Sequence, residues 1–265
     1  MVIIYPNGDI FLNENNDFLK ANKYMPSFFF LDAPLIQECT KKNYILKASN
    51  DDKCLIILKL EPYNAILLGD KECLPELLAF IKDNNYELDG VMCPCEIGDE
   101  LIKLSNDLLK KTYYLNIGMD FMQTTKFSEE SSLDVEHAVI DDVDEIYDCS
   151  IAFFQECGLS DKLDRDITAK RIDSYRIIRK DNFIVSFARM TEDIDNSARV
   201  SMVYTRPKYR GFGYARKVVN VIKNEIIAQG LTATLNVDQK NPISYHLYTS
   251  LGFEKVFSQG IYLVK

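Results

Sequence analysis

The stretch "RPKYRGFGYARKVV", residues 206 to 219, is the most informative part of the sequence. It holds two glycines one residue apart, Gly211 and Gly213, and no acidic residue, although the whole chain has a formal net charge of −9. The glycines are surrounded by cations, namely Arg206, Lys208, Arg210, Arg216 and Lys217. A local concentration of positive charge in an acidic chain favours a small anionic ligand.

The residues on either side of this stretch predict a strand, a loop and a helix. The segment "ARVSMVYT" (198 to 205) has the composition of a strand, and residues 212 to 229 keep apolar side chains at helical spacing until Gly230. The first turn of a helix leaves backbone N–H groups unpaired and carries partial positive charge. A phosphate satisfies both, and glycine lets the backbone approach it closely. The loop is therefore predicted to hold a phosphate-bearing ligand.

The rest of the C-terminal half can be divided into further elements. A strand is expected at 136 to 140, a helix from 141 to Gly158, and a second helix over 161 to 173. Beyond the loop, Asn241 is predicted to cap a short helix that ends at Gly252. Strands complete the half at 175 to 180, 183 to 190, 232 to 237 and, around Gly260, at "FEKVFS" and "IYLVK".

The N-terminal half gives a similar order of elements without repeating the residues. Three strands are expected at 44 to 49, 54 to 60 and 63 to 69. They are followed by a helix at 72 to 84, a strand at 88 to 93 and a helix at 97 to 111, and then by the strands "YYLNIG" and "DFMQTTKF". We infer two similarly folded domains of α/β (α+β) class, 1–130 and 131–265, joined near "SEESS". The turn that matches the glycine loop, "GDKECLPE", has one glycine and no arginine, so only the second domain is equipped for the ligand.

Two motifs now carry a family resemblance. The run from Arg210 to Ala215 fits the arginine/glutamine-x-x-glycine-x-glycine/alanine motif of the GNAT N-acetyltransferase superfamily, and "LNVDQKNPISYHLYTSLGF" resembles the strand and helix that follow in that family. The resemblance covers roughly residues 134 to 265. The whole chain resembles tandem members whose first domain is a degenerate copy. This implies two GNAT-like domains, each a mixed, mostly antiparallel central sheet flanked by helices.

The resemblance also implies the ligand and its contacts. Acetyl-CoA, or another acyl-CoA, would be the donor, and the acceptor would be a small-molecule amine or a peptide amine that attacks directly in a ternary complex. Val203 and Tyr204 would pair with the pantetheine arm, and Asn241 would contact the cofactor or its bound water. The pyrophosphate would be bound by the backbone of Arg210, Gly211, Phe212, Gly213, Tyr214 and Ala215.

Candidate proton-transfer residues follow from the same resemblance and from the chemistry. Tyr248 matches the tyrosine near the thioester sulfur, where its hydroxyl would act as general acid, although it could instead only pack the helix against the sheet. An attacking amine must lose a proton, so a base or a water relay is needed. Glu156 and Glu192 are weak candidates for that base. Tyr245 could compete with Tyr248, whereas His246 is expected to point away from it.

Other functions were weighed against acyl transfer. A non-catalytic module that binds or senses acyl-CoA would share the loop and would differ by showing no turnover. A nucleotide-binding loop is disfavoured because the GK[ST] ending is missing. Cys93-Pro94-Cys95 has the wrong spacing for a zinc or thioredoxin-type motif, and no metal is expected.

Composition limits the class of protein and its partners. The chain has 265 residues, 47% of them hydrophobic, which is ample for two folded domains. Since neither half is basic, nucleic acid is not expected as a partner. No apolar run is long enough to span a membrane, and the seven cysteines suggest reduced thiols, so we expect a cytoplasmic protein. The oligomeric state stays open, a homodimer included.

Overall fold

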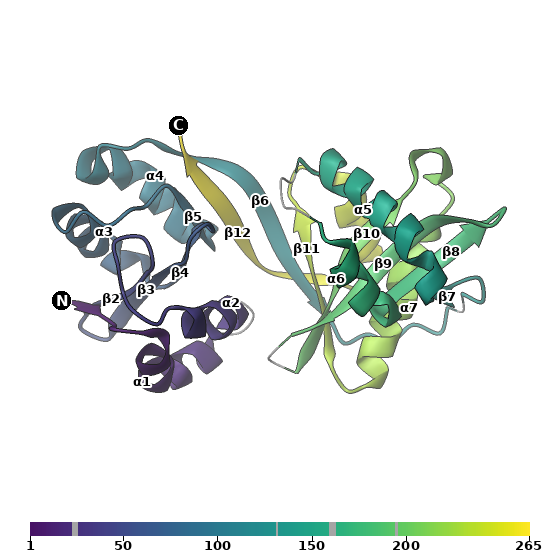
Figure 1. Ribbon diagram of the computed structural model, residues 1–265, viewed down its shortest axis with the longest axis horizontal. Coiled ribbons are helices and arrows are strands. Elements are labelled where there is room, and N and C mark those ends of the chain that lie inside the picture. The colour runs from purple at the N-terminus through teal and green to yellow at the C-terminus, as the bar shows by residue number, and fades with distance from the viewer. Residues whose placement is uncertain (23–25, 131, 159–162, 194–195) are drawn as a thin grey trace. The chain divides into compact units, whose positions relative to one another are not determined.

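The computed structural model describes residues 1–22, 26–130, 132–158, 163–193 and 196–265. It divides into two compact units (Figure 1). The first contains Met1–Phe121, Asp238–Lys240 and Phe257–Lys265, and the second contains Met122–Val237 and Asn241–Val256. The predicted division at 130/131 differs from this one, because residues 122–130 group with the second unit, whereas residues 238–240 and 257–265 group with the first.

The first unit is a sheet between two pairs of helices. Its strands are arranged in the order β1-β2-β3-β4-β5-β12, and neighbours are antiparallel except for β4 and β5. The parallel pair is joined by α3, as a parallel connection requires a crossover. The elements are β1 (Val2–Ile4), α1 (Gly8–Ala21), α2 (Pro26–Asp32), β2 (Tyr44–Asn50), β3 (Lys53–Lys59), β4 (Ala65–Gly69), α3 (Leu74–Asp83), β5 (Gly90–Pro94), α4 (Cys95–Leu109) and β12 (Glu254–Val264).

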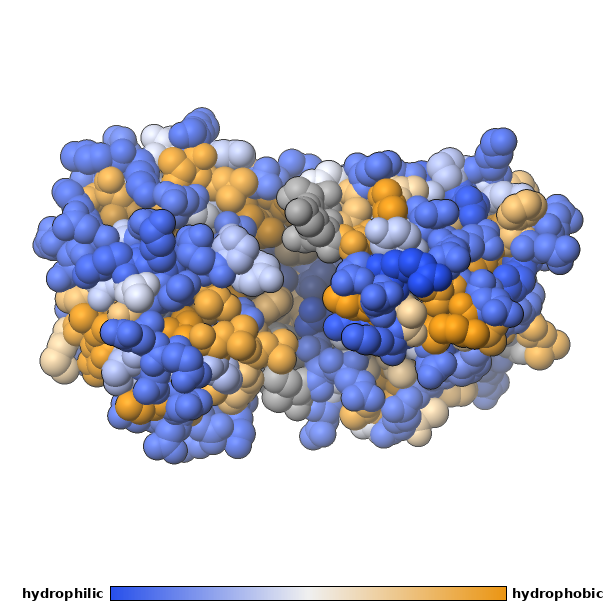
Figure 2. All heavy atoms as spheres, in the orientation of Figure 1, coloured by the Kyte–Doolittle hydropathy of each residue, from blue (hydrophilic) through white to orange (hydrophobic). Residues whose placement is uncertain are grey.

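Strict alternation along these strands makes two cores, one on each face of the sheet. Leu55 and Ile57 pack with α3 and α4, while Ile56 and Leu58 pack with α1 and α2. Both faces are apolar because helices cover both, as Figure 1 shows. Helices α3 and α4 and the first four predicted strands are found here, whereas β1, α1 and α2 were not predicted. The two strands predicted at "YYLNIG" and "DFMQTTKF" are one continuous strand, Tyr113–Thr124. Figure 2 shows apolar side chains at the surface near α2. Leu31 of α2 and Leu35, three residues after the helix, are both exposed.

The second unit has the same order of elements. Its strands run β11-β10-β9-β8-β7, and only β10 and β11 are parallel. The strand β6 (Tyr113–Thr124) leads into this unit from the first. The elements that follow are β7 (Glu136–His137), α5 (Val143–Glu156), α6 (Arg165–Lys170), β8 (Tyr175–Lys180), β9 (Phe183–Glu192), β10 (Ser197–Thr205), α7 (Tyr214–Ala228), β11 (Thr232–Asp238) and α8 (Pro242–Ser250).

Two cores again lie on opposite faces of the sheet. Val218 and Ile222 of α7 pack against Ala188 of β9, and Ile146 of α5 packs on the other face with Phe187. The predicted fold class, a mixed α/β arrangement with a mostly antiparallel sheet flanked by helices, is confirmed. Part of the helix predicted over 161–173, residues 161 and 162, lies outside the described residues.

The C-terminal residues differ from the prediction. The two strands expected around Gly260 are one strand, β12. The C-terminal part of β12 pairs antiparallel with β5, from Gln259↔Pro94 to Leu263↔Gly90. Tyr262 on this strand is fully buried in the core beside α3 and α4. Gly260 does not interrupt the strand, since it lies opposite Cys93 and its neighbours Gln259 and Ile261 also pair with β5.

Gly98 on α4 gives the first testable prediction. Glycine within a helix is usually less stable than alanine, but a Cβ at Gly98 would lie 1.9 Å from Cζ of the Tyr262 ring. We expect Gly98→Ala to destabilise the first unit by about 1–3 kcal/mol through overpacking, measured by urea unfolding. The cost should disappear when Gly98→Ala is introduced into the Tyr262→Leu background. An equal cost in both backgrounds would contradict the contact.

None of the helices in the described part of the chain combines the length and the apolar composition that a membrane crossing needs.

Candidate functional site

The centre of the second unit is the place where β10 and β11 separate. The two strands pair in parallel only from Ser197↔Thr232 to Arg199↔Thr234. Farther along, β10 has an irregularity against β9 between Ser201 and Tyr204, and Met202 has a φ of 54°. Met202 and Val203 therefore fall outside the β9 register, and the backbone of β10 is available for another partner there.

The glycine loop lies between the end of β10 and the start of α7. Gly211 and Gly213 have φ values of 83° and 79°, in the left-handed region that favours glycine. A Cβ on either would meet nothing within 4 Å, so backbone conformation, not crowding, requires these two glycines.

The N-terminus of α7 offers unpaired donors above this open space. Gly213 is its N-cap residue, no side chain caps it, and the first turn contains no acidic residue. Within the described residues, no acceptor is found for the N–H groups of Gly211, Phe212 and Gly213. A 15-residue helix with such an N-terminus can bind an anion through backbone N–H groups. The donor set thus fits a pyrophosphate.

Most of the surrounding cations have another role. Four of the five pair with acids: Arg206 with Glu145, Arg210 with Glu156, Arg216 with Glu130, and Lys217 with Asp134. The bond from Lys217 also lowers the pKa of the Asp134 carboxyl. The positive patch expected from the sequence is therefore largely neutralised, and the backbone remains the principal anion-binding feature.

Arg210 fixes the shape of the turn. Its Nε donates to the carbonyl of Thr205 at 2.9 Å and its Nη2 donates to Glu156 at 2.5 Å. The guanidinium also lies 5.9 Å from the centre of the Tyr204 ring. The side chain thus joins the end of β10 to the end of α5, and leaves anion contacts to the backbone.

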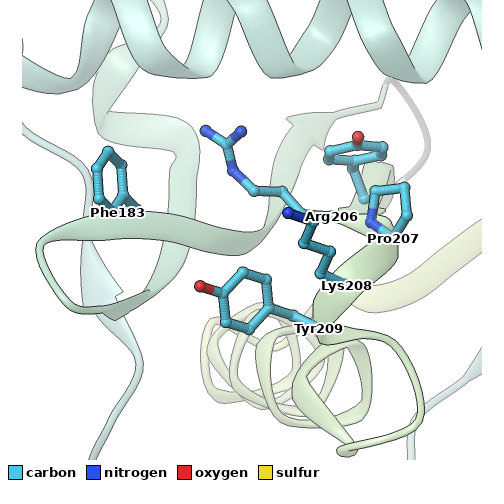
Figure 3. A pocket seen from close by; sticks show the side chains of 6 residues that line it. Phe183, Arg206, Pro207, Lys208 and Tyr209 are labelled. Atoms are coloured by element: carbon cyan, nitrogen blue, oxygen red, sulfur yellow. The ribbon is translucent and has the colours of Figure 1, made fainter.

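Lys208 is the exception among the five, since it has no ion pair with any described residue. It lines a pocket of about 420 Å³ next to the loop, together with Phe183, Tyr204, Arg206, Pro207 and Tyr209. Figure 3 shows Phe183 coming from the β8–β9 hairpin and the other labelled side chains from the turn after β10. The pocket is aromatic with one unpaired cation.

The matching turn of the first unit is closed. A Cβ on Gly69 would lie 2.1 Å from the carbonyl oxygen of Cys54. The next residue, Asp70, holds the turn against the same strand, since its carboxylate accepts a hydrogen bond from the N–H of Cys54 at 3.0 Å. The turn packs on a neighbouring strand and places an acid at the position where the second unit has open space. This agrees with the expectation that only the second unit is equipped for an anion.

Tyr204 and Asn241 both have roles within the protein. The Tyr204 ring is buried against Phe187, and burial raises the pKa of its hydroxyl. Asn241 caps α8 as predicted, accepting from the N–H of Ser244 at 3.0 Å. The residue is exposed at the helix N-terminus. Ligand contacts of Val203, Tyr204 and Asn241 stay predictions.

Tyr248 is a core residue of the second unit. It is 6% exposed and its ring meets that of Phe253 edge-on at 6.1 Å. Burial raises the pKa of Tyr248 to about 12, so its hydroxyl keeps its proton through the neutral range. Tyr245, by contrast, is 36% exposed. The burial suits the packing role, and a protonated hydroxyl suits a general acid.

The two carboxylates named as base candidates lie in different surroundings. Glu156 is held by Arg210, which ties it to the turn. Glu192 lies opposite Ala198 of β10. Ala198 is five residues before Val203, which is about 16 Å along β10 at about 3.3 Å per residue. Their role in proton transfer stays a prediction, and neither position favours it.

Two functional features were missed by sequence reasoning. Glu145 accepts from Arg206 at 2.7 Å and from the N–H of Ile184 at 2.8 Å, which holds the turn against β9. Arg189 lines a second pocket, described below. An arginine in the otherwise apolar run "FIVSFARM" was the signal that could have pointed to Arg189.

Comparison with known proteins relates this geometry to a family model and to solved structures. Residues 188–261, from β9 to β12, match the model of a family described as FR47-like protein. No curated protein sequence matches the chain.

Solved structures share the fold over the full chain. An acetyltransferase from the GNAT family of Colwellia psychrerythraea has a TM-score of 0.63 at 12% identity, covering 100% of this chain and 99% of its own. A Drosophila protein has 0.62 at 13%, with the same coverage. A GCN5-related N-acetyltransferase from Sphaerobacter thermophilus has 0.60 at 11%, covering 99% of this chain and 94% of its own. These likenesses confirm the fold that the sequence motifs implied: the chain has the fold of GNAT-family acetyltransferases.

Proposed function

We propose that the second unit binds an acyl-CoA and transfers its acyl group, most simply acetyl, to a primary amine. The observation that carries this is the loop after β10. Its two glycines have positive φ, and the uncapped N-terminus of α7 offers unpaired N–H donors. Two of the structural neighbours are described as acetyltransferases, which supports acyl transfer on this fold.

Each part of the site would then have a task. Acetyl-CoA supplies an activated thioester when it is bound. The backbone from Arg210 to Ala215 holds its pyrophosphate, and Val203 and Tyr204 position the pantetheine arm beside the irregularity of β10. A backbone N–H on that strand can stabilise the oxyanion. The hydroxyl of Tyr248 donates a proton to the departing thiolate.

The amine must reach the thioester in its neutral form. Since Glu156 is tied to Arg210 and Glu192 lies far along the strand, a water relay is the simplest route for the proton. Attack is direct, in a ternary complex, and no residue of the chain has to be acylated. In this proposal the first unit is a degenerate copy that contributes no cofactor loop, and the protein acts in the cytoplasm.

Thiol release from acetyl-CoA with a panel of amines tests the proposal. We expect amine-dependent release of free coenzyme A, together with the mass of the acetylated amine. Tight binding of coenzyme A without turnover on any amine would favour the non-catalytic module. No effect of acetyl-CoA on thermal stability would contradict both.

Lys208 provides a prediction about the cofactor. An exposed charge contact contributes about 1 kcal/mol or less, so Lys208→Gln should raise the Kd for acetyl-CoA up to about fivefold and weaken its salt dependence. Titration at two ionic strengths measures both. Lys82→Gln, a surface change in α3 of the first unit, is the matched control and should leave both unchanged. Equal behaviour of the two variants would remove Lys208 from the cofactor site.

A further inference from the structure

A second pocket in the second unit has no assigned role. It measures about 510 Å³ and lies among the end of α6, the turn before β8 and the end of β9. Most of the residues that line it are charged or carry a hydroxyl, although their hydrocarbon stems also form part of the wall: Lys170, Arg171, Asp173, Ser174, Arg189, Met190, Thr191 and Glu192. Figure 2 shows hydrophilic side chains gathered over α6.

Arg189 is the distinctive residue of this pocket. Its guanidinium lies 5.9 Å from the centre of the Tyr175 ring, and its Nε is shielded from water without a hydrogen-bond partner. Within the described residues no acid pairs with Arg189. A shielded, unpaired N–H on a charged group is costly. Because Nε itself is shielded, an anion in the pocket would have to bind the guanidinium through its terminal nitrogens, and its opposite charge would offset part of that cost.

The charge of the lining limits the anion. Three cations, Lys170, Arg171 and Arg189, face two carboxylates, Asp173 and Glu192, which gives a formal charge of +1. Among the described residues none of these five forms an ion pair with another. A single negative charge matches this lining better than a phosphate dianion does. Arginine also pairs with carboxylates through two parallel hydrogen bonds.

The position of Arg189 connects the pocket with the proposed reaction. Arg189 lies directly opposite Ser201 in the β9–β10 ladder, where the irregularity of β10 begins. Val203 is two residues beyond Ser201 on β10, which is about 7 Å along that strand at about 3.3 Å per residue. A short molecule can therefore place one end at Arg189 and the other beside Val203.

The pocket also lies on a suitable face of the sheet. Phe187, two residues before Arg189 and hence on the same face, packs with α5. The loop belongs to α7, which packs on the opposite face. A donor held at the loop and an acceptor held at Arg189 would thus meet from different sides.

We propose that this pocket binds the carboxylate of the acceptor, so that the acceptor is a short amino carboxylate. The inference rests on the proposed function and adds the substrate class to it. Arg189 is the principal carboxylate ligand, and Lys170 and Arg171 add positive charge at the pocket rim.

Calorimetric titration of the protein saturated with coenzyme A tests this binding without turnover. The probes are glycine, β-alanine and γ-aminobutyrate, each compared with its primary amide, which keeps the amine and lacks the charge. For at least one pair we expect the wild type to bind the carboxylate at least about tenfold more tightly, and Arg189→Met to lose that preference. Arg165→Met is the matched control, since Arg165 is an exposed arginine of α6 paired with Asp144, and it should keep the preference.

A second variant, Arg171→Met, tests the inference if Arg189→Met does not fold. If Arg189→Met does not give a cooperative thermal transition, Arg171→Met, at an exposed position, should reduce the preference at least about threefold. The inference is overturned if every carboxylate binds no better than its amide, or if a folded Arg189→Met keeps the preference. It is also overturned if Arg171→Met, used in place of an unfolded Arg189→Met, keeps the preference.

The two proposals fail in different ways. Preferential binding of amino carboxylates without thiol release from acetyl-CoA would refute acyl transfer and leave the carboxylate site standing. Thiol release that is as fast with the amides as with the amino carboxylates would refute the carboxylate site and leave acyl transfer standing.

Discussion

Gly213→Val should raise the Kd for acetyl-CoA at least about tenfold, a loss of about 1.4 kcal/mol of binding free energy. Gly213 has a φ of 79° at the N-cap of α7, where its neighbours present unpaired N–H groups. A β-branched side chain does not adopt that φ without strain. The backbone would shift, and a valine side chain would also occupy the open space above the loop. Equilibrium titration with acetyl-CoA measures the effect.

Gly230→Val is the matched control for this variant. Gly230 follows the same helix, has a φ of 77°, and a Cβ there also meets nothing within 4 Å. Both variants should lose similar thermal stability, because the backbone strain is alike. Only Gly213→Val should lose affinity for the cofactor. If both variants bind acetyl-CoA as the wild type does, the pyrophosphate is not held by this loop.

Tyr248→Phe should lower kcat about 100-fold, the lower end of what a positioned proton donor contributes, with the KM for acetyl-CoA changed less than about twofold. The substitution keeps the ring that packs on Phe253 and removes only the hydroxyl. Steady-state thiol release measures both constants. Tyr245→Phe, on the same helix and 36% exposed, should leave them unchanged.

The expected pH dependence of the activity follows from the raised pKa of Tyr248. Burial raises the pKa of Tyr248 to about 12, so the hydroxyl is a proton donor at every pH below that value. We therefore expect no loss of wild-type activity from Tyr248 ionisation between pH 7 and about 10, the ordinary pKa of tyrosine. A wild-type decline near pH 10 that is absent in Tyr248→Phe would contradict the buried assignment. An unchanged kcat in Tyr248→Phe would leave Tyr248 as packing alone.

Much of the fold was predictable because local signals agreed with one another. The strand, loop and helix around Gly213 combine turn chemistry, helical spacing and a helix end at Gly230, and the structure has β10 and α7 there. The N-terminal helices α1 and α2 lacked that agreement. The segment "GDIFLNENNDFLKA", which forms α1, is rich in asparagine, a weak helix former, so tertiary packing of residues such as Phe11 and Leu19 decides its structure.

The site was less predictable than the fold. Sequence position suggested that Arg206, Arg210, Arg216 and Lys217 would act together on an anion, but each has a carboxylate partner from another part of the chain. Such partners, like Glu145 of α5, are set by packing between elements and have no local signature. For the same reason Arg189 was not recognised, since its importance comes from facing a pocket formed by α6 and the turn before β8.

The pairing of β12 with β5 has a consequence for how the protein is made. Residues 257–265 follow the whole of the second unit in the sequence, yet they fill the place beside β5 in the sheet of the first unit. Domains usually fold in the order in which they are synthesised. The first unit must therefore wait until the second unit has been synthesised, and the edge of β5 can meanwhile pair with wrong partners. The unit that is synthesised first is therefore unable to finish folding first.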